Sequence, residues 1–157
     1  MWRKIVGSAE FLLIGTILVS LWFSYSFEEK LSIYLDGRKE QIILDDDILW
    51  YNASDYSIKL TDSGIKKIKT LRIGVYGEPF IVKVGKTEIF RGAFWIPVSS
   101  VNYRGIVIIA PLQVEEYNII KFELGYPPEI SVENSSTDRR NDSRIIIHFR
   151  NVGKLKQ

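Results

Sequence analysis

The sequence predicts a mainly β protein, with an N-terminal transmembrane helix followed by an antiparallel β-sandwich of the Ig-like or jelly-roll-like kind. Three observations predict it. An uncharged apolar run covers residues 11–27, segments of alternating hydrophobicity follow from residue 31, and glycine, proline, asparagine and aspartate separate these segments at short intervals. We therefore divide the 157 residues into a membrane and assembly segment, 1–30, and one extracellular β domain, 31–157.

The apolar run has asymmetric flanks. Arg3 and Lys4 precede it and Glu28 and Glu29 follow it, which predicts a cytoplasmic N-terminus and an exported domain. Its length is at the lower limit for a helix that spans a bilayer. Three interpretations remain open: a retained signal anchor, a secretory signal cleaved near residues 24–26, and a buried core helix.

The start of the apolar run resembles archaeal type IV pilin-like proteins, in which a short basic leader precedes Q-x-S-x-E-F and an uninterrupted apolar helix. Ser8, Glu10 and Phe11 match that motif, and Val6 stands in place of the glutamine. The resemblance implies processing between Ile5 and Val6, and a helix that packs against its copies with Glu10 paired to a neighbour's amino terminus. The other interpretation of Glu10 is a solvated charge at the membrane interface, favoured by the helix dipole.

From residue 31 the alternation is typical of strands. Residues 31–35 and 38–44 flank Asp36-Gly37, which is a strong hairpin signal. Residues 62–67 are predicted to form at most a helical turn. The other predicted strands cover residues 56–61, 70–76, 80–84, 88–91, 94–98, 106–110, 117–124, 129–133 and 144–150.

In the last predicted strand, Ile145, Ile147 and Phe149 are expected to face the core. His148 alternates with them and is expected to point outward. No neighbouring motif supplies the orienting acid and the nucleophile that histidine catalysis needs, so we predict no catalytic role for it.

Two aromatic pairs, Trp50-Tyr51 and Phe94-Trp95, could offer a ring for stacking a sugar. Adjacent strand residues point to opposite faces, so at most one ring of each pair would be exposed. We predict that these rings mainly pack in the core.

Asp45, Asp46 and Asp47 form the sharpest acidic cluster. Carboxylate oxygens are the ligands that Ca²⁺ prefers, but the spacing is not that of an EF-hand. Consecutive side chains rarely point at one ion, so we predict a solvated turn, with a weak calcium site as the alternative.

Three N-x-S sequons begin at Asn52, Asn134 and Asn141. Residues 134–143 contain no apolar side chain, so we predict an exposed loop in which Asn134 and Asn141 are accessible to glycosylation.

Composition narrows the function. The chain has no cysteine and one histidine, which excludes disulfides, thiol nucleophiles, iron–sulfur clusters and histidine-rich metal centres. A net charge of +2 is too small to indicate a nucleic-acid partner. No P-loop, G-x-S-x-G or G-x-G-x-x-G motif occurs. We therefore predict no enzyme, no cofactor and no small-molecule substrate.

The prediction that remains is a structural surface protein in the cell membrane or in a surface filament: a pilin-like filament subunit or filament accessory anchored by its N-terminal helix. Its expected partners are the membrane and either copies of itself, as a homo-oligomer, or other surface proteins. The alternative is a membrane-anchored extracellular binding module for a surface-layer protein or glycan. Frequent isoleucine, lysine and glutamate are typical of a thermophile, or alternatively of an AT-rich genome.

Overall fold

The computed structural model describes residues 29–38, 40–110, 117–128 and 138–156. The apolar run 11–27 and the predicted strand 129–133 lie outside these ranges. Within them, no helix is long and apolar enough to cross a membrane.

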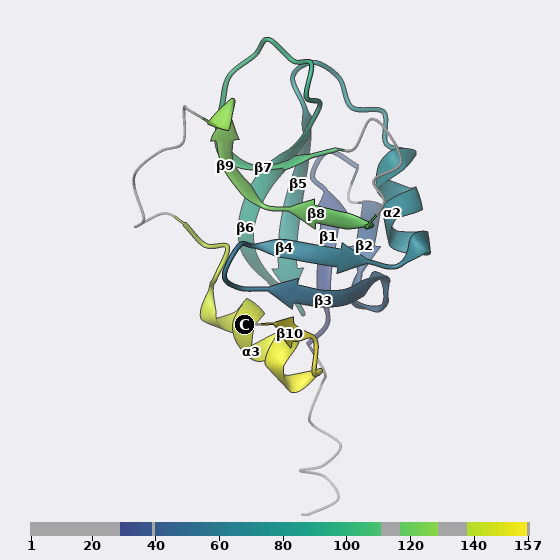
Figure 1. The fold of residues 1–157 in the computed structure, drawn as a ribbon, viewed down its shortest axis with the longest axis vertical. Helices are drawn as coiled ribbons and strands as arrows, with labels where there is room; N and C mark the ends of the chain where they lie inside the picture. The colour runs from purple at the N-terminus through teal and green to yellow at the C-terminus, as the bar shows by residue number, and fades with distance from the viewer. Residues whose placement is uncertain (1–28, 39, 111–116, 129–137, 157) are drawn as a thin grey trace, which may run out of the picture.

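Two sheets packed against each other make up the described part of the fold (Figure 1). The larger sheet has the strand order β2-β1-β5-β6-β7-β9, and the smaller has the order β10-β3-β4-β8. In Figure 1 the smaller sheet lies in front, and its strands run across those of the larger sheet. The mainly β prediction is confirmed. The strands are β1 (Leu31–Leu35), β2 (Glu40–Leu44), β3 (Ile48–Asn52), β4 (Ser57–Leu60), β5 (Glu78–Val84), β6 (Thr87–Trp95), β7 (Tyr103–Ile109), β8 (Ile119–Lys121), β9 (Glu123–Tyr126) and β10 (Leu155–Lys156).

Both sheets are mixed, so the prediction of an antiparallel Ig-like or jelly-roll-like sandwich is wrong in strand direction. β6 pairs with β7 in parallel, with Gly92 opposite Ile106, and β10 pairs with β3 in parallel. The chain between Trp95 and Tyr103 connects these two parallel strands. Alternation of apolar residues specifies which face a side chain takes, but it does not specify the direction of the neighbouring strand.

The predicted hairpin at Asp36-Gly37 is confirmed as β1 and β2. The predicted strands 88–91 and 94–98 join into the single strand β6. The glycine between them, Gly92, does not end the strand: a Cβ there would overlap the Ile106 carbonyl oxygen of the adjacent β7. This glycine therefore serves close approach of two strands.

Two α-helices accompany the sheets in the described part of the chain. The predicted helical turn is confirmed and extends to α2 (Asp62–Lys69), where the Thr61 hydroxyl accepts a hydrogen bond from Gly64 N. The predicted strand 70–76, which follows α2, is wrong, because these residues form no strand.

The second helix, α3 (Ser143–Asn151), replaces the predicted strand 144–150, which is therefore wrong. Ile145, His148 and Phe149 are buried, at the helical spacing i, i+3, i+4, whereas Ile147 is 51% exposed. The expectation that Ile147 faces the core and His148 the solvent is reversed, because the backbone period is 3.6 rather than 2.

The core between the sheets is rich in aromatic rings. Phe80 and Phe94 of the larger sheet are fully buried. Tyr51 of the smaller sheet and Phe149 of α3 are also fully buried, and these two rings stack with their centroids 5.1 Å apart. Trp95 is buried in a second cluster on the other face of the larger sheet. Core packing therefore accounts for these five rings, three of which (Tyr51, Phe94 and Trp95) belong to the two predicted aromatic pairs.

Candidate functional site

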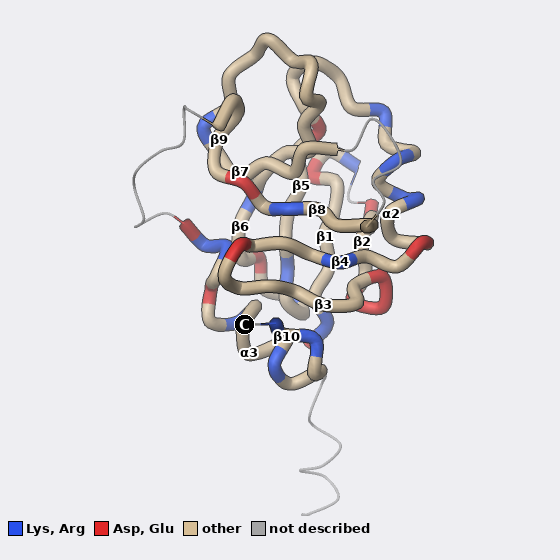
Figure 2. The backbone as a smooth tube through the Cα atoms, viewed as in Figure 1, with Lys and Arg blue, Asp and Glu red and all other residues tan. Residues whose placement is uncertain are grey.

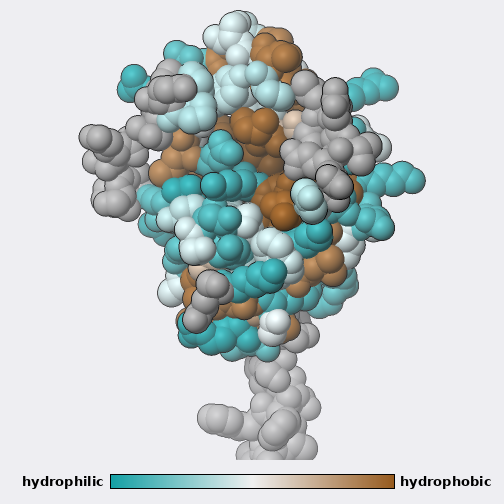
Figure 3. All heavy atoms as spheres, in the orientation of Figure 1, coloured by the Kyte–Doolittle hydropathy of each residue, from teal (hydrophilic) through white to brown (hydrophobic). Residues whose placement is uncertain are grey.

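A groove lies on the outer face of the smaller sheet. Trp50 and Asn52 of β3 point to this face because Tyr51 between them points into the core. The groove has a volume of about 610 Å³. Figure 3 shows apolar surface exposed between hydrophilic side chains in the middle of this face. The groove is lined by Trp50, Asn52, Asp55, Ser57, Pro97, Ile109, Ala110, Ile119, Ile120, Lys121 and Glu123.

The polar end of this groove is the β3–β4 turn. Asn52 Oδ1 accepts hydrogen bonds from Ser54 N (3.0 Å) and Ser54 Oγ (2.7 Å). Asp55 Oδ1 accepts from Ser57 N (3.1 Å) and Ser57 Oγ (2.6 Å). These bonds from Ser57, helped by the charge of Lys121, lower the pKa of Asp55 below its usual value. The turn thus holds an amide and an ionised carboxylate in fixed positions beside the groove.

Asn141 lies against the same turn. Its Nδ2 donates to the Ala53 carbonyl oxygen at 2.8 Å, and its Oδ1 accepts from the Tyr51 hydroxyl at 3.1 Å. Asn52 and Asn141, which were predicted as separate sequons, therefore meet at one corner of the domain. Asn141 is exposed, as predicted, but both ends of its amide have partners. Asn134 lies outside the described residues.

Arg140, next to it, is buried, so the prediction of a wholly exposed loop is wrong at this residue. Its guanidinium binds Asp138 through two hydrogen bonds (2.9 and 2.7 Å), donates to the Phe122 carbonyl oxygen (2.8 Å), and lies 3.7 Å from the centre of the Tyr56 ring. Its carbonyl oxygen accepts from the Tyr51 hydroxyl at 2.9 Å. A charged side chain is buried here because each of its three guanidinium nitrogens donates a hydrogen bond and Asp138 balances its charge.

A buried ionic cluster joins α3 to the turn between β2 and β3. That turn is the 3₁₀-helix η1 (Asp45–Asp47). His148 Nε2 lies 2.5 Å from Asp45 Oδ1, and Lys154 Nζ donates to the Asp45 carbonyl oxygen at 2.7 Å and lies 3.3 Å from Oδ2. Burial opposes ionisation of Asp45, but His148 and Lys154 outweigh it, and the pKa of Asp45 lies below its usual value.

The three aspartates therefore differ in their surroundings. Asp45 and Asp47 are buried, which corrects the prediction of a solvated turn for both, and Asp46 is exposed. Asp47 Oδ2 accepts from Lys67 Nζ at 2.6 Å and from Leu44 N at 2.9 Å. Among the described residues, no three His, Asp or Glu side chains are grouped to hold a metal ion.

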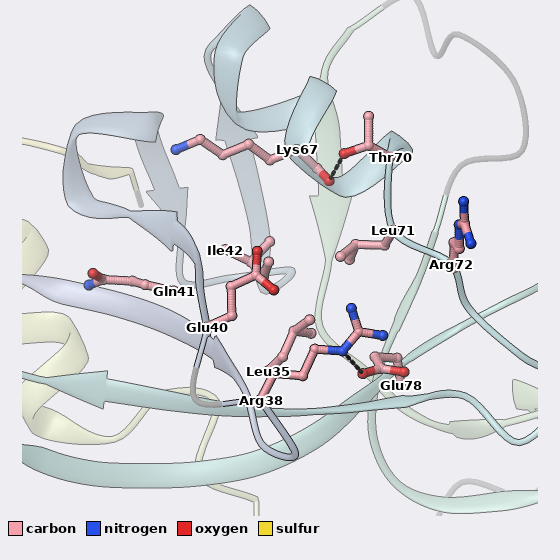
Figure 4. Close-up of a pocket in the computed structure, with 10 residues that line it drawn as sticks. All are labelled: Leu35, Arg38, Glu40, Gln41, Ile42, Lys67, Thr70, Leu71, Arg72 and Glu78. Atoms are coloured by element: carbon pink, nitrogen blue, oxygen red, sulfur yellow. Dashed lines mark hydrogen bonds and ion pairs between the residues drawn. The ribbon is translucent and has the colours of Figure 1, made fainter.

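A smaller pocket of about 360 Å³ opens between α2 and the β1–β2 hairpin (Figure 4). Figure 4 shows the Arg38 and Glu40 side chains extending into it from the hairpin, and Arg38 Nε lies 4.0 Å from Glu78 Oε1. Lys67 also lines the pocket, but its ammonium group points away toward Asp47. Charges of both signs line this pocket, so it selects no particular ligand charge.

The two ends of β5 carry different surfaces. Leu31, the start of β1, lies opposite Val84 at one end. Near that end, Lys30 pairs with Asp46 at 3.7 Å and Lys154 binds the adjacent aspartate. Figure 2 shows basic residues gathered around α3 and β10 there. We name Lys30, Arg150, Lys154 and Lys156 the basic end.

The opposite end of β5 begins at Glu78 and carries exposed apolar side chains. Val75, Tyr76 and Val98 are all more than half exposed, with Tyr76 at 78%. Their two loops are joined by a hydrogen bond of 2.7 Å from the Ser99 hydroxyl to the Val75 carbonyl oxygen. We name these three residues the apolar loops.

The predicted assembly and processing residues, Ile5, Val6, Ser8, Glu10 and Phe11, lie outside the described residues. The buried Asp45–His148–Lys154 cluster does not follow from the sequence pattern, because that pattern predicts a strand where α3 forms. The sequence does carry one signal for this helix. Asp142 precedes the apolar segment and Gly153 follows it, and these residue types are typical of the start and the end of a helix respectively.

Comparisons with models of protein families, with curated proteins and with solved structures find no match to this chain.

Proposed function

We propose that the protein is a structural surface protein whose N-terminal segment anchors it in the membrane and whose β domain contacts other surface proteins. The observation that carries the proposal is the difference between the two ends of the domain. The basic end lies where β1 begins, immediately after the apolar run of residues 11–27. The apolar loops lie at the far end of β5.

Each end suits the surface that it would meet. Lysine and arginine near an anionic membrane surface each contribute about 1 kcal/mol of attraction. Exposed apolar side chains at the distal end suit contact with another protein. Because β5 has seven residues, the apolar loops would lie roughly 20 Å farther from the membrane than the basic end.

The proposed occupant of the apolar loops is a second copy of this chain. The resemblance of Ser8, Glu10 and Phe11 to pilin-like proteins supports this choice, because such subunits assemble with their own copies. In a filament, the apolar helices would pack together and the β domains would face outward.

Photo-crosslinking on intact cells tests the assembly. A photoreactive residue in place of Tyr76 should give a product of twice the monomer mass, and the same residue in place of the exposed Ile147 on α3 should not. Crosslinks to a different protein only would reject self-association and favour an accessory role. Equal crosslinking from both positions would reject the distal contact.

N-terminal sequencing of the native chain distinguishes the anchoring modes. A first residue of Val6 indicates pilin-like processing, Met1 indicates a signal anchor, and a start near Phe27 indicates ordinary secretion. In the processed case, Glu10→Ala should reduce filament yield, because an unpaired carboxylate beside the membrane is unfavourable.

The membrane contact has its own test. Arg150→Glu with Lys156→Glu should weaken binding to anionic vesicles, and the effect should disappear at high salt. Lys66→Glu with Lys69→Glu is the matched control, because it reverses the same number of charges on α2, away from the basic end. Equal losses in both variants would contradict an oriented basic end.

The second candidate is an anchored binding module, which the groove beside Trp50 favours. Its volume of about 610 Å³ falls in the usual range for ligand sites. A glycan or peptide array probed with the full chain, and repeated with Trp50→Ala, would distinguish this candidate from the structural one.

A further inference from the structure

We propose that Asn52 is an N-glycosylation site and that the first sugar of its glycan lies in the groove beside Trp50. The inference rests on the exported topology of the proposed function, because N-x-S sequons are used only in exported segments. It reverses the preference drawn from the sequence, which favoured the sequons in the polar stretch 134–143.

The two described sequons differ in the state of the amide nitrogen. Asn52 Oδ1 is held by the sequon's own serine, through Ser54 N and Ser54 Oγ. Asn52 Nδ2 has no hydrogen-bond partner among the described residues. Asn141 Nδ2, in contrast, donates to the Ala53 carbonyl oxygen at 2.8 Å, and its Oδ1 accepts from Tyr51. A sugar on Asn141 would break a contact that holds the corner together, whereas a sugar on Asn52 would break none.

The serine contact also orients Asn52 for reaction. Because Oδ1 is fixed by two donors, the amide plane is fixed, and Nδ2 is the end left open. Asn52 lines the groove, so a substituent on its amide has space beside it. The chain therefore presents the reacting nitrogen of the sequon beside the groove.

Trp50 gives the groove a preference for a sugar. It lies two residues before Asn52 on the same strand, so both side chains lie on the same face of the sheet. Trp50 lines the groove, while Lys156, whose ammonium lies 4.1 Å from the ring centre, does not. The ring side that faces the groove therefore remains available to the C–H groups of a pyranose.

Polar groups surround the same space. Asp55 is ionised and held by Ser57, with Oδ2 free of hydrogen bonds among the described residues, and Lys121 and Glu123 also line the groove. Carboxylates accept hydrogen bonds from hydroxyls, and the ammonium donates to them. Stacking on a ring together with hydrogen bonding to hydroxyls matches the two faces of a sugar.

The reaction requires an activated sugar donor, which is a saccharide linked through C1 to a polyprenyl phosphate carrier, and a membrane glycosyltransferase. Asn52 Nδ2 forms the bond to C1, and the C1–O bond to the phosphate breaks, so that the lipid phosphate leaves with the electron pair. The proton lost from Nδ2 passes to a base of the transferase. Oδ1 keeps its bonds to Ser54 throughout.

Glycopeptide mass spectrometry on the full chain, purified from the membranes of its own cells, tests the attachment. We expect a glycan on the peptide that contains Asn52. Asn52→Gln and Ser54→Ala should each abolish that mass, and Asn141→Gln should leave it unchanged. A glycan on Asn141 with an unmodified Asn52 would overturn the inference.

A second measurement separates this inference from the proposed function. Protease added to intact cells reports whether the domain is outside. An accessible domain with an unmodified Asn52 overturns the glycan and leaves the surface location intact. A domain protected from protease overturns both.

A separate measurement tests whether the first sugar lies in the groove beside Trp50. Glycosidase should remove the glycan several-fold faster from Trp50→Ala than from the parent chain, because the ring no longer shields the first sugar. Leu49→Ala is the matched control, since Leu49 is an exposed neighbour that does not line the groove. Equal release rates in the parent and Trp50→Ala chains would overturn the seating.

Discussion

Replacing each of the three consecutive aspartates by alanine should have very different effects, because only their surroundings differ. Asp45 is buried against His148 and Lys154, and Asp46 is 81% exposed on its side chain. We predict that Asp45→Ala strongly destabilises the domain and that Asp46→Ala does not. A purely solvated turn would give equal, small effects.

The loss of stability expected for Asp45→Ala follows from which side chains lose a hydrogen-bond or ionic partner. His148 is 5% exposed on its side chain and is left without its acceptor, whereas Lys154 keeps the Asp45 carbonyl oxygen at 2.7 Å and reaches solvent. Breaking a buried ion pair costs about 3–5 kcal/mol, so we expect the lower limit, about 3 kcal/mol. The Asp46 pair with Lys30 is exposed, at 3.7 Å, and contributes about 0–1 kcal/mol.

Thermal unfolding of the full chain in detergent, followed by near-ultraviolet circular dichroism, measures both variants. A loss of about 3 kcal/mol corresponds to a fall in Tm of about 10 °C for a domain of this size. Adding His148→Ala to Asp45→Ala should cost little more than the single change, because the two residues act together. Equal Tm values for the Asp45 and Asp46 variants would refute the reasoning.

The same carboxylate makes stability depend on pH. The folded-state pKa of Asp45 lies below its usual value, so its contribution to the free energy of unfolding is complete above about pH 4 and is lost as the pH falls further. The Tm difference between the parent and Asp45→Ala should therefore shrink in acid, and a constant difference would contradict the assignment. Phe149→Ala should cost about 3–5 kcal/mol and Ile147→Ala less than about 0.5 kcal/mol in denaturant unfolding, whereas a strand at this position would make the two losses similar. Gly77→Ala should lower stability by about 2 kcal/mol or more, because its φ is +75° and a Cβ would overlap a buried tryptophan ring; Gly37→Ala, where a Cβ meets nothing, is its control.

Much of the β architecture could be predicted from local sequence patterns. The hairpin at Asp36-Gly37 needed only two neighbouring segments and a turn signal. The helix at α3 could not be predicted in the same way, because Ile145 to Ile147 are three consecutive β-branched residues, which favour a strand. Its burial on one side only, through Phe149 stacked on Tyr51, is a tertiary contact that overrides the local preference.

The candidate site was predictable only in its components. Trp50 and Asn52 stand out in the sequence as an aromatic residue and a sequon, and alternation places them on one face. Their hollow depends on β7, β8 and β9, which come from a distant part of the chain. The contact that occupies Asn141 likewise joins residues 88 positions apart, so no local pattern contains it.

The position of α3 and β10 has a kinetic consequence. β10 pairs with β3, and His148 contacts Asp45 across 103 positions of the chain. Closing so long a loop is slow, and its entropy must be lost before the contacts form. The β3 edge that β10 covers and the partners of Asp45 therefore remain absent during synthesis until residues 143–156 have emerged. If the domain is exported as proposed, a chain that reaches the translocation channel before that moment can still pass through it unfolded. A chain that has already closed this loop must first unfold.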